Sequence, residues 1–317
     1  MTDVREAPTA TTETRSNPHG SLIWYELITP DPEGAKAFYD AVVPGWSCGE
    51  RMPGDMDYRM IGRSDGGNAG GVLRLTDDMA SHGAKPIWLG YIGVNDVDGT
   101  VAQIEATGGK ALMPASDIPD VGRIAMVTDP QGAPFYVMKP TPPKGQEDKV
   151  SDVFSPTDEQ RVSWNELSTS DVQAARAFYE ELFGWTSHDY MPMPEGNEYR
   201  FFDHDGVRIG AVGPCMDQQP PHWRYYFRVP SIGAAQGVAQ AQGGTIALGP
   251  MRCRAATKSS SARTRRAPNS PWSAKLEEEN QHDPKDCHMP VVRQRRGAQG
   301  GRILCVRLPR HPGRARP

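Results

Sequence analysis

The chain has 317 residues, 37% of them hydrophobic, and a formal net charge of −4. This length is sufficient for two domains of ordinary size. No stretch approaches the roughly 18 consecutive apolar residues that a membrane-spanning helix needs. Five cysteines without regular spacing argue against a disulfide framework. Residues 1–18 are polar and lack the apolar region of a secretory signal, so we expect a disordered N-terminus and a cytoplasmic protein.

Charge is unevenly distributed along the chain. Residues 1–251 contain 19 Lys and Arg against 34 Asp and Glu, a net charge of −15, whereas residues 252–317 contain 16 against 5, a net charge of +11. An acidic body discourages nonspecific nucleic-acid binding, while a basic tail favours it. We therefore expect no nucleic-acid partner for the body of the protein, and the tail needs a separate explanation.

The first 140 residues contain two consecutive β-α-β-β-β patterns. In the first, a strand at 21–28 leads to Asp31, a plausible helix N-cap, and Pro32 at the first helical position. The glycine-rich run 66–71 is predicted to be a hairpin turn rather than a phosphate-binding loop, because no helix follows it. The remaining predicted elements are strands at 46–49, 58–61 and 71–75, a strand at 87–94, a helix at 97–107, and strands at 111–113, 122–127 and 134–138.

The same pattern then repeats. Trp24-Tyr25-Glu26-Leu27 recurs 140 residues later as Trp164-Asn165-Glu166-Leu167, and Ala37-Phe38-Tyr39 recurs as Ala177-Phe178-Tyr179. A repeat of this length indicates two homologous domains in tandem rather than a solenoid. Residues 141–160, rich in Pro, Asp and Lys, are predicted to form a linker. The repeated elements are strands at 162–167, 199–202, 207–212 and 223–229 and helices at 172–183 and 232–242.

Paired β-α-β-β-β modules resemble the vicinal oxygen chelate superfamily, which includes glyoxalases, bleomycin-resistance proteins and extradiol dioxygenases. The resemblance is carried by the string from Asp31 through Gly45-Trp46, by its second copy, and by Thr128-Asp129-Pro130-Gln131-Gly132. It implies an α+β fold of two tandem glyoxalase-like domains, at 19–140 and 161–251, the second of them incomplete at its C-terminal end. The fold hosts unrelated chemistries, so the resemblance alone does not assign a function.

Metal-using members of this family hold a divalent ion with His and Glu from both modules. The resemblance places those ligand positions at Trp24, Tyr91 and Tyr136 in the first domain and at Trp164 and Tyr226 in the second. Aromatic side chains cannot replace imidazole or carboxylate around such an ion. The histidines form no pair with ligand spacing. We therefore expect no metal site and no cofactor.

Two acidic residues remain as candidate catalytic groups. Glu26 and Glu166 each lie two residues after a Trp, so strand alternation directs Trp and Glu to the same face. A carboxylate in an apolar pocket has a raised pKa and can act as a general base. The alternative is a structural Glu, hydrogen-bonded to backbone or to a neighbouring Tyr. The residues predicted to line a ligand pocket, with core packing as the alternative, are Trp24, Trp88, Tyr91, Tyr136, Trp164 and Tyr226.

The repeat stops at Met251. Residues 252–270 are rich in Arg, Ser and Ala, without a usable apolar period. With one allowed choice of codons, reading residues 252–274 one nucleotide earlier gives E-V-P-G-G-D-E-I-I-I-G-T-D-P-Q-G-A-E-F-A-L-V-G, which contains the T-D-P-Q-G-A of Thr128 to Ala133. We hypothesise a single-nucleotide deletion at or close to Met251, which makes 252–317 a frame-shifted tail. The alternative is a genuine basic, disordered extension that binds nucleic acid or an acidic partner.

The sequence therefore predicts a metal-independent glyoxalase-like protein that binds a small hydrophobic or aromatic molecule. One alternative is an enzyme, a lyase, isomerase or oxygenase, that uses Glu26 or Glu166 as a base or recruits metal unconventionally. The other is a sequestering protein of the bleomycin-resistance kind, for which an aromatic cleft and acidic groups suit a cationic ligand. The acidic body mildly favours sequestration, and no pattern in the sequence predicts the oligomeric state.

Limited proteolysis tests the predicted boundary at Met251. Because the residues beyond it show no apolar period, we expect a protease to remove them before it cuts either domain. The measurement is a time course of digestion followed by intact-mass spectrometry. A tail that resists cleavage as long as the domains do would contradict the boundary.

Overall fold

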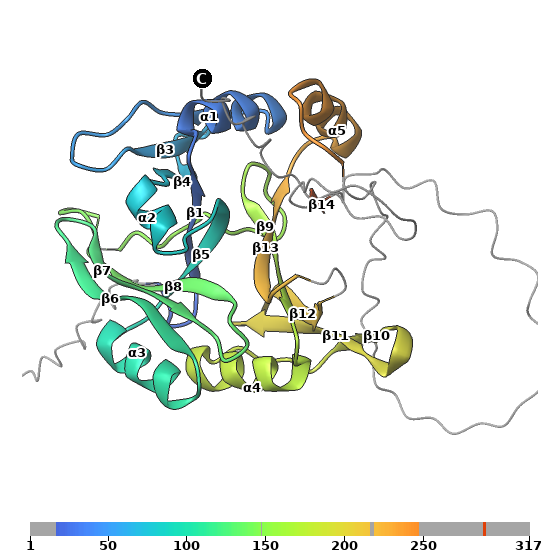
Figure 1. Cartoon of the computed structure of the whole chain (residues 1–317). Coiled ribbons are helices and arrows are strands. Elements are labelled where there is room, and N and C mark those ends of the chain that lie inside the picture. The colour runs from blue at the N-terminus through green and yellow to red at the C-terminus, as the bar shows by residue number, and fades with distance from the viewer. Residues whose placement is uncertain (1–16, 147, 216–218, 247–287, 290–317) are drawn as a thin grey trace, which may run out of the picture.

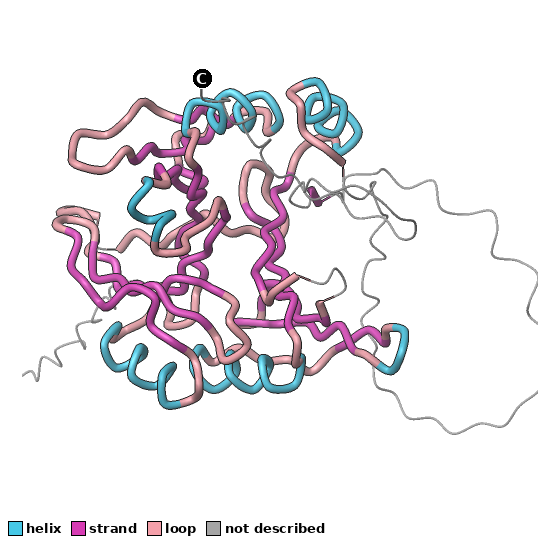
Figure 2. The backbone as a smooth tube through the Cα atoms, viewed as in Figure 1, coloured by secondary structure: helices cyan, strands magenta, loops and turns pink. Residues whose placement is uncertain are grey.

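A computed structural model describes residues 17–146, 148–215, 219–246 and 288–289, and shows an α+β architecture of two mixed sheets with flanking helices (Figures 1 and 2). The predicted tail at 252–317 therefore lies outside the described residues, except for two residues of one short strand. Within the described part of the chain, no helix is long and apolar enough to cross a membrane.

Domain 1 is built on one eight-stranded sheet. Its order is β2-β3-β4-β1-β5-β8-β7-β6, with β1 and β5 antiparallel at the centre. On either side of this pair, β1 is parallel to β4 and β5 is parallel to β8, so two β-α-β-β-β modules join edge to edge. The elements are β1 (Leu22–Thr29), α1 (Pro32–Val42), β2 (Trp46–Cys48), β3 (Tyr58–Arg63), β4 (Asn68–Arg74), α2 (Asp77–Ser81), β5 (Ile87–Gly93), α3 (Val97–Ala106), β6 (Lys110–Ile118), β7 (Gly122–Thr128) and β8 (Pro134–Pro140).

Domain 2 repeats this plan as far as its second helix. Its sheet has the order β10-β11-β12-β9-β13-β14, with β9 and β13 as the central antiparallel pair. Counterparts of β6, β7 and β8 are not found among its described residues. The elements are β9 (Val162–Thr169), α4 (Val172–Phe183), β10 (Tyr190–Pro192), a 3-10 turn η1 (Pro194–Gly196), β11 (Glu198–His204), β12 (Val207–Pro214), β13 (His222–Arg228), α5 (Ile232–Ala241) and β14 (His288–Met289).

Most predicted elements are confirmed within a few residues, although β6 continues five residues beyond the predicted strand at 111–113 and the turn η1 was not expected. The short helix α2, capped by the Thr76 hydroxyl, has no apolar stripe and was not expected. The predicted turn at 66–71 ends sooner, since β4 already begins at Asn68. Strand β10 is fully exposed, so it carries none of the alternation that marks a half-buried strand.

Both domains begin their first helix with the same cap. The Asp31 carboxylate accepts a hydrogen bond from the Gly34 amide at 2.9 Å, and Asp171 accepts from the Gln173 and Ala174 amides. These bonds satisfy amides that the first helical turn leaves unpaired. Capping at corresponding positions fixes the direction in which α1 and α4 leave their strands.

The two sheets pack back to back and share one hydrophobic core. Figure 1 shows the sheets facing each other, with α1 beside α5 at one end and α3 beside α4 at the other. The Tyr25 ring of β1 lies against the Tyr225 ring of β13, with centroids 5.1 Å apart. Buried side chains from both domains belong to this single cluster. Each sheet consequently turns its other face outward.

Hydrogen bonds cross the domain interface in related pairs. The Trp46 indole donates to the Gln160 carbonyl oxygen at 2.9 Å, and the Trp185 indole donates to the Gly20 carbonyl oxygen at 2.8 Å. Gly20 and Gln160 are 140 residues apart, and both have a positive φ, 89° and 63°. Each domain thus anchors the chain just before the first strand of the other.

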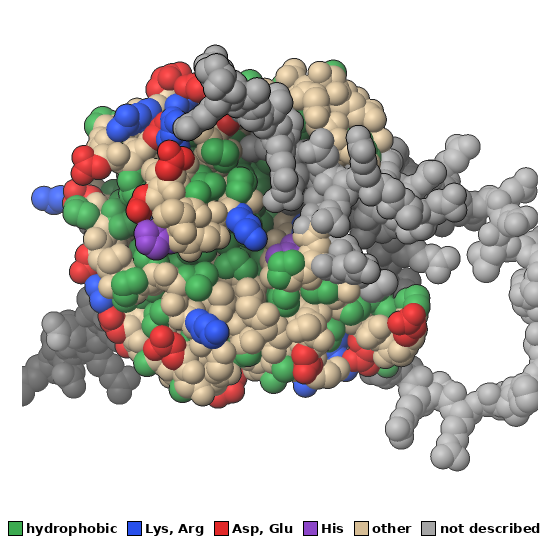
Figure 3. All heavy atoms as spheres, in the orientation of Figure 1, with side chains coloured by type: hydrophobic (Ala, Val, Ile, Leu, Met, Phe, Trp, Pro, Cys, Tyr) green, Lys and Arg blue, Asp and Glu red, His purple; other side chains and the backbone are tan. Residues whose placement is uncertain are grey.

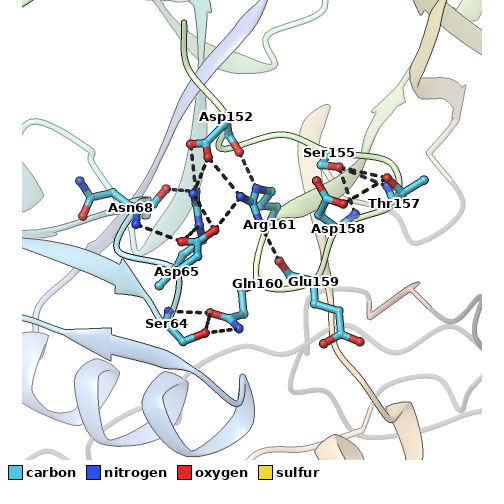
Figure 4. A network of polar contacts seen from close by, with 12 residues as sticks. Ser64, Asp65, Asn68, Asp152, Ser155, Thr157, Asp158, Glu159, Gln160 and Arg161 are labelled. Carbon is cyan, nitrogen blue, oxygen red and sulfur yellow. Dashed lines mark hydrogen bonds and ion pairs between the residues drawn. The ribbon is translucent and has the colours of Figure 1, made fainter. Parts of the chain in front are cut away.

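The predicted linker is tied to domain 1 by charged and polar contacts (Figure 4). Asp152 accepts hydrogen bonds from both Arg63 and Arg161, and Arg161 also bridges to Asp65 at 2.8 Å. The Gln160 side chain exchanges hydrogen bonds with Ser64. The segment is therefore held between the domains by hydrogen bonds and ion pairs.

We expect Tyr25→Phe to lower the free energy of unfolding by about 1–2 kcal/mol in one cooperative transition. The Tyr25 hydroxyl donates to Asn165 Oδ1 at 2.8 Å, and its removal leaves a buried acceptor without its donor. Urea unfolding followed by Trp fluorescence measures the change, with the exposed Tyr190→Phe as control. Two separate transitions in the unchanged protein would contradict the shared core.

Candidate functional site

The outward face of the domain 1 sheet forms a cup lined by aromatic and methionine side chains. Strand pairing sets Trp24 opposite Tyr91 and Tyr91 beside Tyr136, which places all three on the face that carries Glu26. The Tyr91 and Tyr136 rings stack with centroids 4.3 Å apart. The apolar cluster on this face contains Ile23, Ile28, Leu73, Leu75, Leu89, Tyr91, Ile124, Tyr136 and Met138, with Trp24, Tyr58, Met79, Met113 and Met126 packed against it.

Glu26 lies at the base of the cup and is only 2% exposed. Its Oε2 accepts a hydrogen bond from the Tyr91 hydroxyl at 3.0 Å. Its Oε1 is buried and has no hydrogen bond of ordinary geometry. Buried polar oxygens are rarely left in this state in native proteins, so the exception points to a functional or strained group.

Burial sets the protonation of Glu26. It raises the pKa of the carboxyl from 4.5 to about 7, against smaller opposing effects of the Tyr91 and Tyr58 hydroxyls. The residue paired with Glu26 on β5 is Leu89, which is fully buried and offers no charge. Near neutral pH this carboxyl therefore exchanges a proton readily, as a general acid or base must.

Tyr58 closes the cup above Glu26. Its hydroxyl accepts a hydrogen bond from the Trp24 indole at 2.8 Å. A Cβ at Gly71, which pairs with Glu26 across β1 and β4, would overlap this hydroxyl. The absence of a side chain at Gly71 is therefore what lets Tyr58 reach across the strand.

Domain 2 has the same cup with a different charge balance. The Trp164 indole donates to the Tyr199 hydroxyl at 3.0 Å, and that hydroxyl donates to Glu166 at 2.8 Å. The residue paired with Glu166 is Arg224, which donates to its Oε1 at 2.6 Å. Glu166 is thus a member of an ion pair, whereas Glu26 has an aliphatic neighbour.

The predicted ligand-lining residues do not all lie together. Trp24, Tyr91 and Tyr136 surround Glu26, and Tyr226 lies opposite Trp164 in the second cup. Trp88 lies on the back face of its sheet, where its indole donates to the Tyr39 hydroxyl at 2.8 Å and its ring packs against Phe227. We leave Trp88 out of the site.

Three residues of the cups were missed from the sequence. Tyr58 and Tyr199 hold corresponding places at the starts of β3 and β11, and the repeat could have marked them as a pair. Arg224 corresponds to Leu89, but only the strand register shows that each lies beside its Glu.

The donor set of the cups does not fit a divalent metal ion. No group of three or more His, Cys, Asp or Glu side chains lies together in the described parts of the chain. Around Glu26, the positions that the family uses for ligands carry an indole and two phenols with hydroxyls held protonated, because burial raises the pKa of Tyr91 and Tyr136. A single carboxylate among such groups is a poor chelate.

A pocket of about 490 Å³ opens at the rim of the domain 1 cup. Leu73 and Met79 belong both to its wall and to the apolar cluster around Glu26. Its other lining residues are Arg51, Asp55, Met56, Asp57, Arg74 and Thr76. Figure 3 shows hydrophobic side chains at the surface between α2 and β8, with acidic side chains mainly along the outline of the molecule.

The family model described as Glyoxalase/Bleomycin resistance protein/Dioxygenase superfamily matches residues 21–137 and 161–258. The chain belongs to this superfamily. The two matched segments correspond to the two tandem domains, and the second extends past the predicted end at Met251.

The chain is also similar to several named proteins. It is 32% identical over 233 residues to CFP32, a proposed glyoxylase of Mycobacterium bovis and Mycobacterium tuberculosis, covering 73% of this chain and 85% of that protein. It is 30% identical over 248 residues to the anthracycline biosynthesis protein DauV of Streptomyces sp. strain C5, with the same coverage. A Mn(II)-bound glyoxalase from Novosphingobium aromaticivorans matches with a TM-score of 0.49 and 17% identity, covering 74% of this chain and 75% of that one.

We expect Glu26→Gln to stabilise the protein by about 3 kcal/mol at pH 8 and to change it little at pH 4. The folded pKa of about 7 lies above the unfolded value of 4.5, so the unchanged protein loses stability as pH rises between these values. Glutamine carries no charge that burial has to desolvate, so the free energy of unfolding of the variant does not fall over this pH range. Chemical denaturation at several pH values measures the difference.

Glu166→Gln is the matched control for this prediction. It breaks the pair with Arg224 and should lower the free energy of unfolding by about 1–3 kcal/mol at pH 8. Equal effects of the two substitutions at pH 8 would contradict the distinction between the cups.

Proposed function

We propose that the domain 1 cup binds a small hydrophobic or aromatic molecule beside Glu26, without a resident metal ion, in the cytoplasm. The observation that carries this proposal is the buried carboxyl of Glu26 at the base of an apolar cluster that reaches the rim pocket. Its Oε1 has no hydrogen bond of ordinary geometry, and its polar neighbours are the Tyr91 and Tyr58 hydroxyls. A ligand that donates a hydrogen bond to Oε1 and presents apolar surface would suit both the carboxyl and the apolar lining of the cup.

The lining supports a polarizable, planar ligand. The cup carries Met79, Met113, Met126 and Met138 in addition to its aromatic rings, and Met56 of the pocket wall is 58% exposed. Methionine side chains adapt their shape and contact aromatic rings favourably. The names of relatives such as DauV connect them with anthracycline biosynthesis, which agrees with an aromatic ligand for this chain.

Entry to the cup requires Tyr58 to move. Glu26 does not line the rim pocket, and Tyr58 pairs with the pocket residue Leu73 across β3 and β4. A ligand in the pocket would therefore meet the Tyr58 ring before it reached the carboxyl. The exposed loop at 51–56, which ends two residues before Tyr58, leaves open surface toward which this side chain would turn.

A second candidate function is catalysis in the same cup, with Glu26 as a general base. The raised pKa of Glu26 favours it, because a carboxylate that titrates near pH 7 takes up a proton more readily than an exposed one. This activity would rise with pH through about 7. Glu166, paired with Arg224, is the weaker candidate for the same role.

Titration with the neutral aromatic dye N-phenyl-1-naphthylamine tests the ligand site. We expect saturable binding of one dye per chain, weakened at least tenfold by Met79→Lys, which places a charge in the wall of the rim pocket. Val207→Lys is the matched control, since Val207 is 42% exposed and lines a separate pocket of about 390 Å³ between the domains. Equal loss of affinity in both variants would contradict a site in the domain 1 cup.

Two further measurements separate the candidate functions. Metal analysis of the purified protein should find no stoichiometric Fe, Mn, Zn or Ni, and a full equivalent of any of them would overturn the metal-free site. Glu26→Gln should keep the dye affinity. For any substrate that the protein turns over, loss of turnover in this variant with unchanged affinity would favour the enzyme over the binding protein.

A further inference from the structure

Two arginines in the wall of the rim pocket are held more loosely than the arginines in the ion pairs elsewhere. The other ion pairs that arginines form with described carboxylates join nitrogen and oxygen at 2.5 to 3.2 Å. Arg74 reaches Asp57 Oδ2 only at 3.9 Å, and its side chain is 56% exposed. Arg51 donates to the Gly54 carbonyl oxygen at 2.9 Å and has no described carboxylate at ion-pair distance. Both guanidinium groups therefore keep N–H donors for another partner.

The carboxylate beside these arginines already has a stronger partner. Arg59 donates to both oxygens of Asp57, at 3.0 and 3.4 Å, and another of its nitrogens donates to Glu33 at 2.7 Å. The Arg59 guanidinium holds the pKa of the Asp57 carboxyl below its usual value, and the charges of Arg51 and Arg74 act in the same direction. Three guanidinium groups thus gather around one carboxylate, which binds only one of them with good geometry.

The second carboxylate of the pocket does not neutralise this charge. Asp55 is exposed on the loop at 51–56 and forms no ion pair with either arginine in the described part of the chain. Residues 1–251 contain 19 Lys and Arg against 34 Asp and Glu, so the protein as a whole repels anions. Two loosely held guanidinium groups in one pocket wall are a local exception to this field, and they are suited to attract an anionic group.

The same pocket offers an apolar surface next to the arginines. Leu73 and Arg74 are consecutive residues of β4, and the apolar lining is completed by Met56 and Met79. Leu73 and Met79 also belong to the apolar cluster of the cup, whereas Arg74 is largely exposed. A ligand that places its apolar body against the cup side of the pocket therefore meets the guanidinium groups at its solvent end. The volume of about 490 Å³ is typical of pockets for small molecules.

We propose that the ligand of the domain 1 cup is an aromatic carboxylate, whose charged group is bound by Arg51 and Arg74 in the rim pocket while its ring is directed toward the cup. This inference rests on the proposed function, since it names the class of molecule that the same site takes. The guanidinium fork matches the two oxygens of a carboxylate. A single negative charge suits the pocket better than a phosphate, because Asp55 in the wall opposes a second charge.

Isothermal titration calorimetry at pH 7.5 and low salt, with three probes that share one ring system, tests the proposal. We expect 2-naphthylacetate to bind at least about tenfold more tightly than 2-naphthylacetamide, a neutral molecule of nearly the same shape. The cation 2-(2-naphthyl)ethylammonium should bind more weakly than the amide, because the two guanidinium groups repel it.

Substitution of the arginines separates charge from shape. Arg51→Gln and Arg74→Gln together should lower the affinity for the acetate at least about tenfold and that for the amide by less than about twofold. Lys110→Gln with Lys139→Gln is the matched control, because both lysines are exposed and lie outside the rim pocket, on β6 and β8. This control removes the same net charge and should change the affinity for the acetate by less than about twofold.

The outcomes distinguish this inference from the proposed function. Equal binding of acetate and amide would overturn the carboxylate assignment and leave a binding cup for aromatic molecules. A preference for the acetate that persists in the double arginine variant, or that disappears equally in the lysine control, would show that Arg51 and Arg74 are not its source. Tightest binding of the ammonium probe would reverse the sign of the site. Failure of all three probes to bind would overturn the proposed function together with the inference.

Discussion

The back-to-back packing of the two sheets is the constraint on which the rest of the structure depends. One apolar core serves both domains, and reciprocal indole-to-carbonyl hydrogen bonds from Trp46 and Trp185 fix where each first strand begins. Because the back faces are occupied in this way, the front faces must point away from each other. The cups therefore lie on opposite sides of the molecule, and each is formed by residues of its own sheet alone.

Within this common scaffold, a single paired position makes the cups chemically different. Leu89 and Arg224 hold corresponding places on β5 and β13, next to Glu26 and Glu166. The guanidinium compensates the second carboxylate at 2.6 Å, and the aliphatic side chain leaves the first one desolvated. Keeping a buried carboxyl without a charged partner costs stability. Such a cost is common at functional sites, which supports a role for domain 1 rather than domain 2.

The sequence was most informative where periodicity is strong. The helices at 32–42 and 172–183 and the central strands follow from apolar stripes, caps and alternation, and alternation also placed Trp24 and Glu26 on one face. The same alternation places Trp88 on the opposite face, because it lies three residues before Tyr91 on β5. The prediction that Trp88 lines the ligand pocket did not take this rule into account. Arg224 could not be assigned, because its closeness to Glu166 arises from strand register, which no local pattern records. The repeat could have marked Tyr58 and Tyr199 as a pair, but not their closeness to the carboxylates.

The contact between Tyr25 and Asn165 limits which halves can pair in this arrangement. These two residues hold the same place in the two repeats. Gly90 and Tyr225 also correspond to each other, and the Gly90 amide donates a hydrogen bond to the Tyr225 hydroxyl at 2.6 Å. A symmetric homodimer would have to pair Tyr with Tyr and Asn with Asn at its axis. Unlike partners at corresponding positions, such as Tyr25 and Asn165, require two halves that differ in sequence, as the two repeats of this chain do. Two copies of either half placed in this arrangement would therefore lose the hydrogen bond between Tyr25 and Asn165, which makes the interface specific for one copy of each repeat.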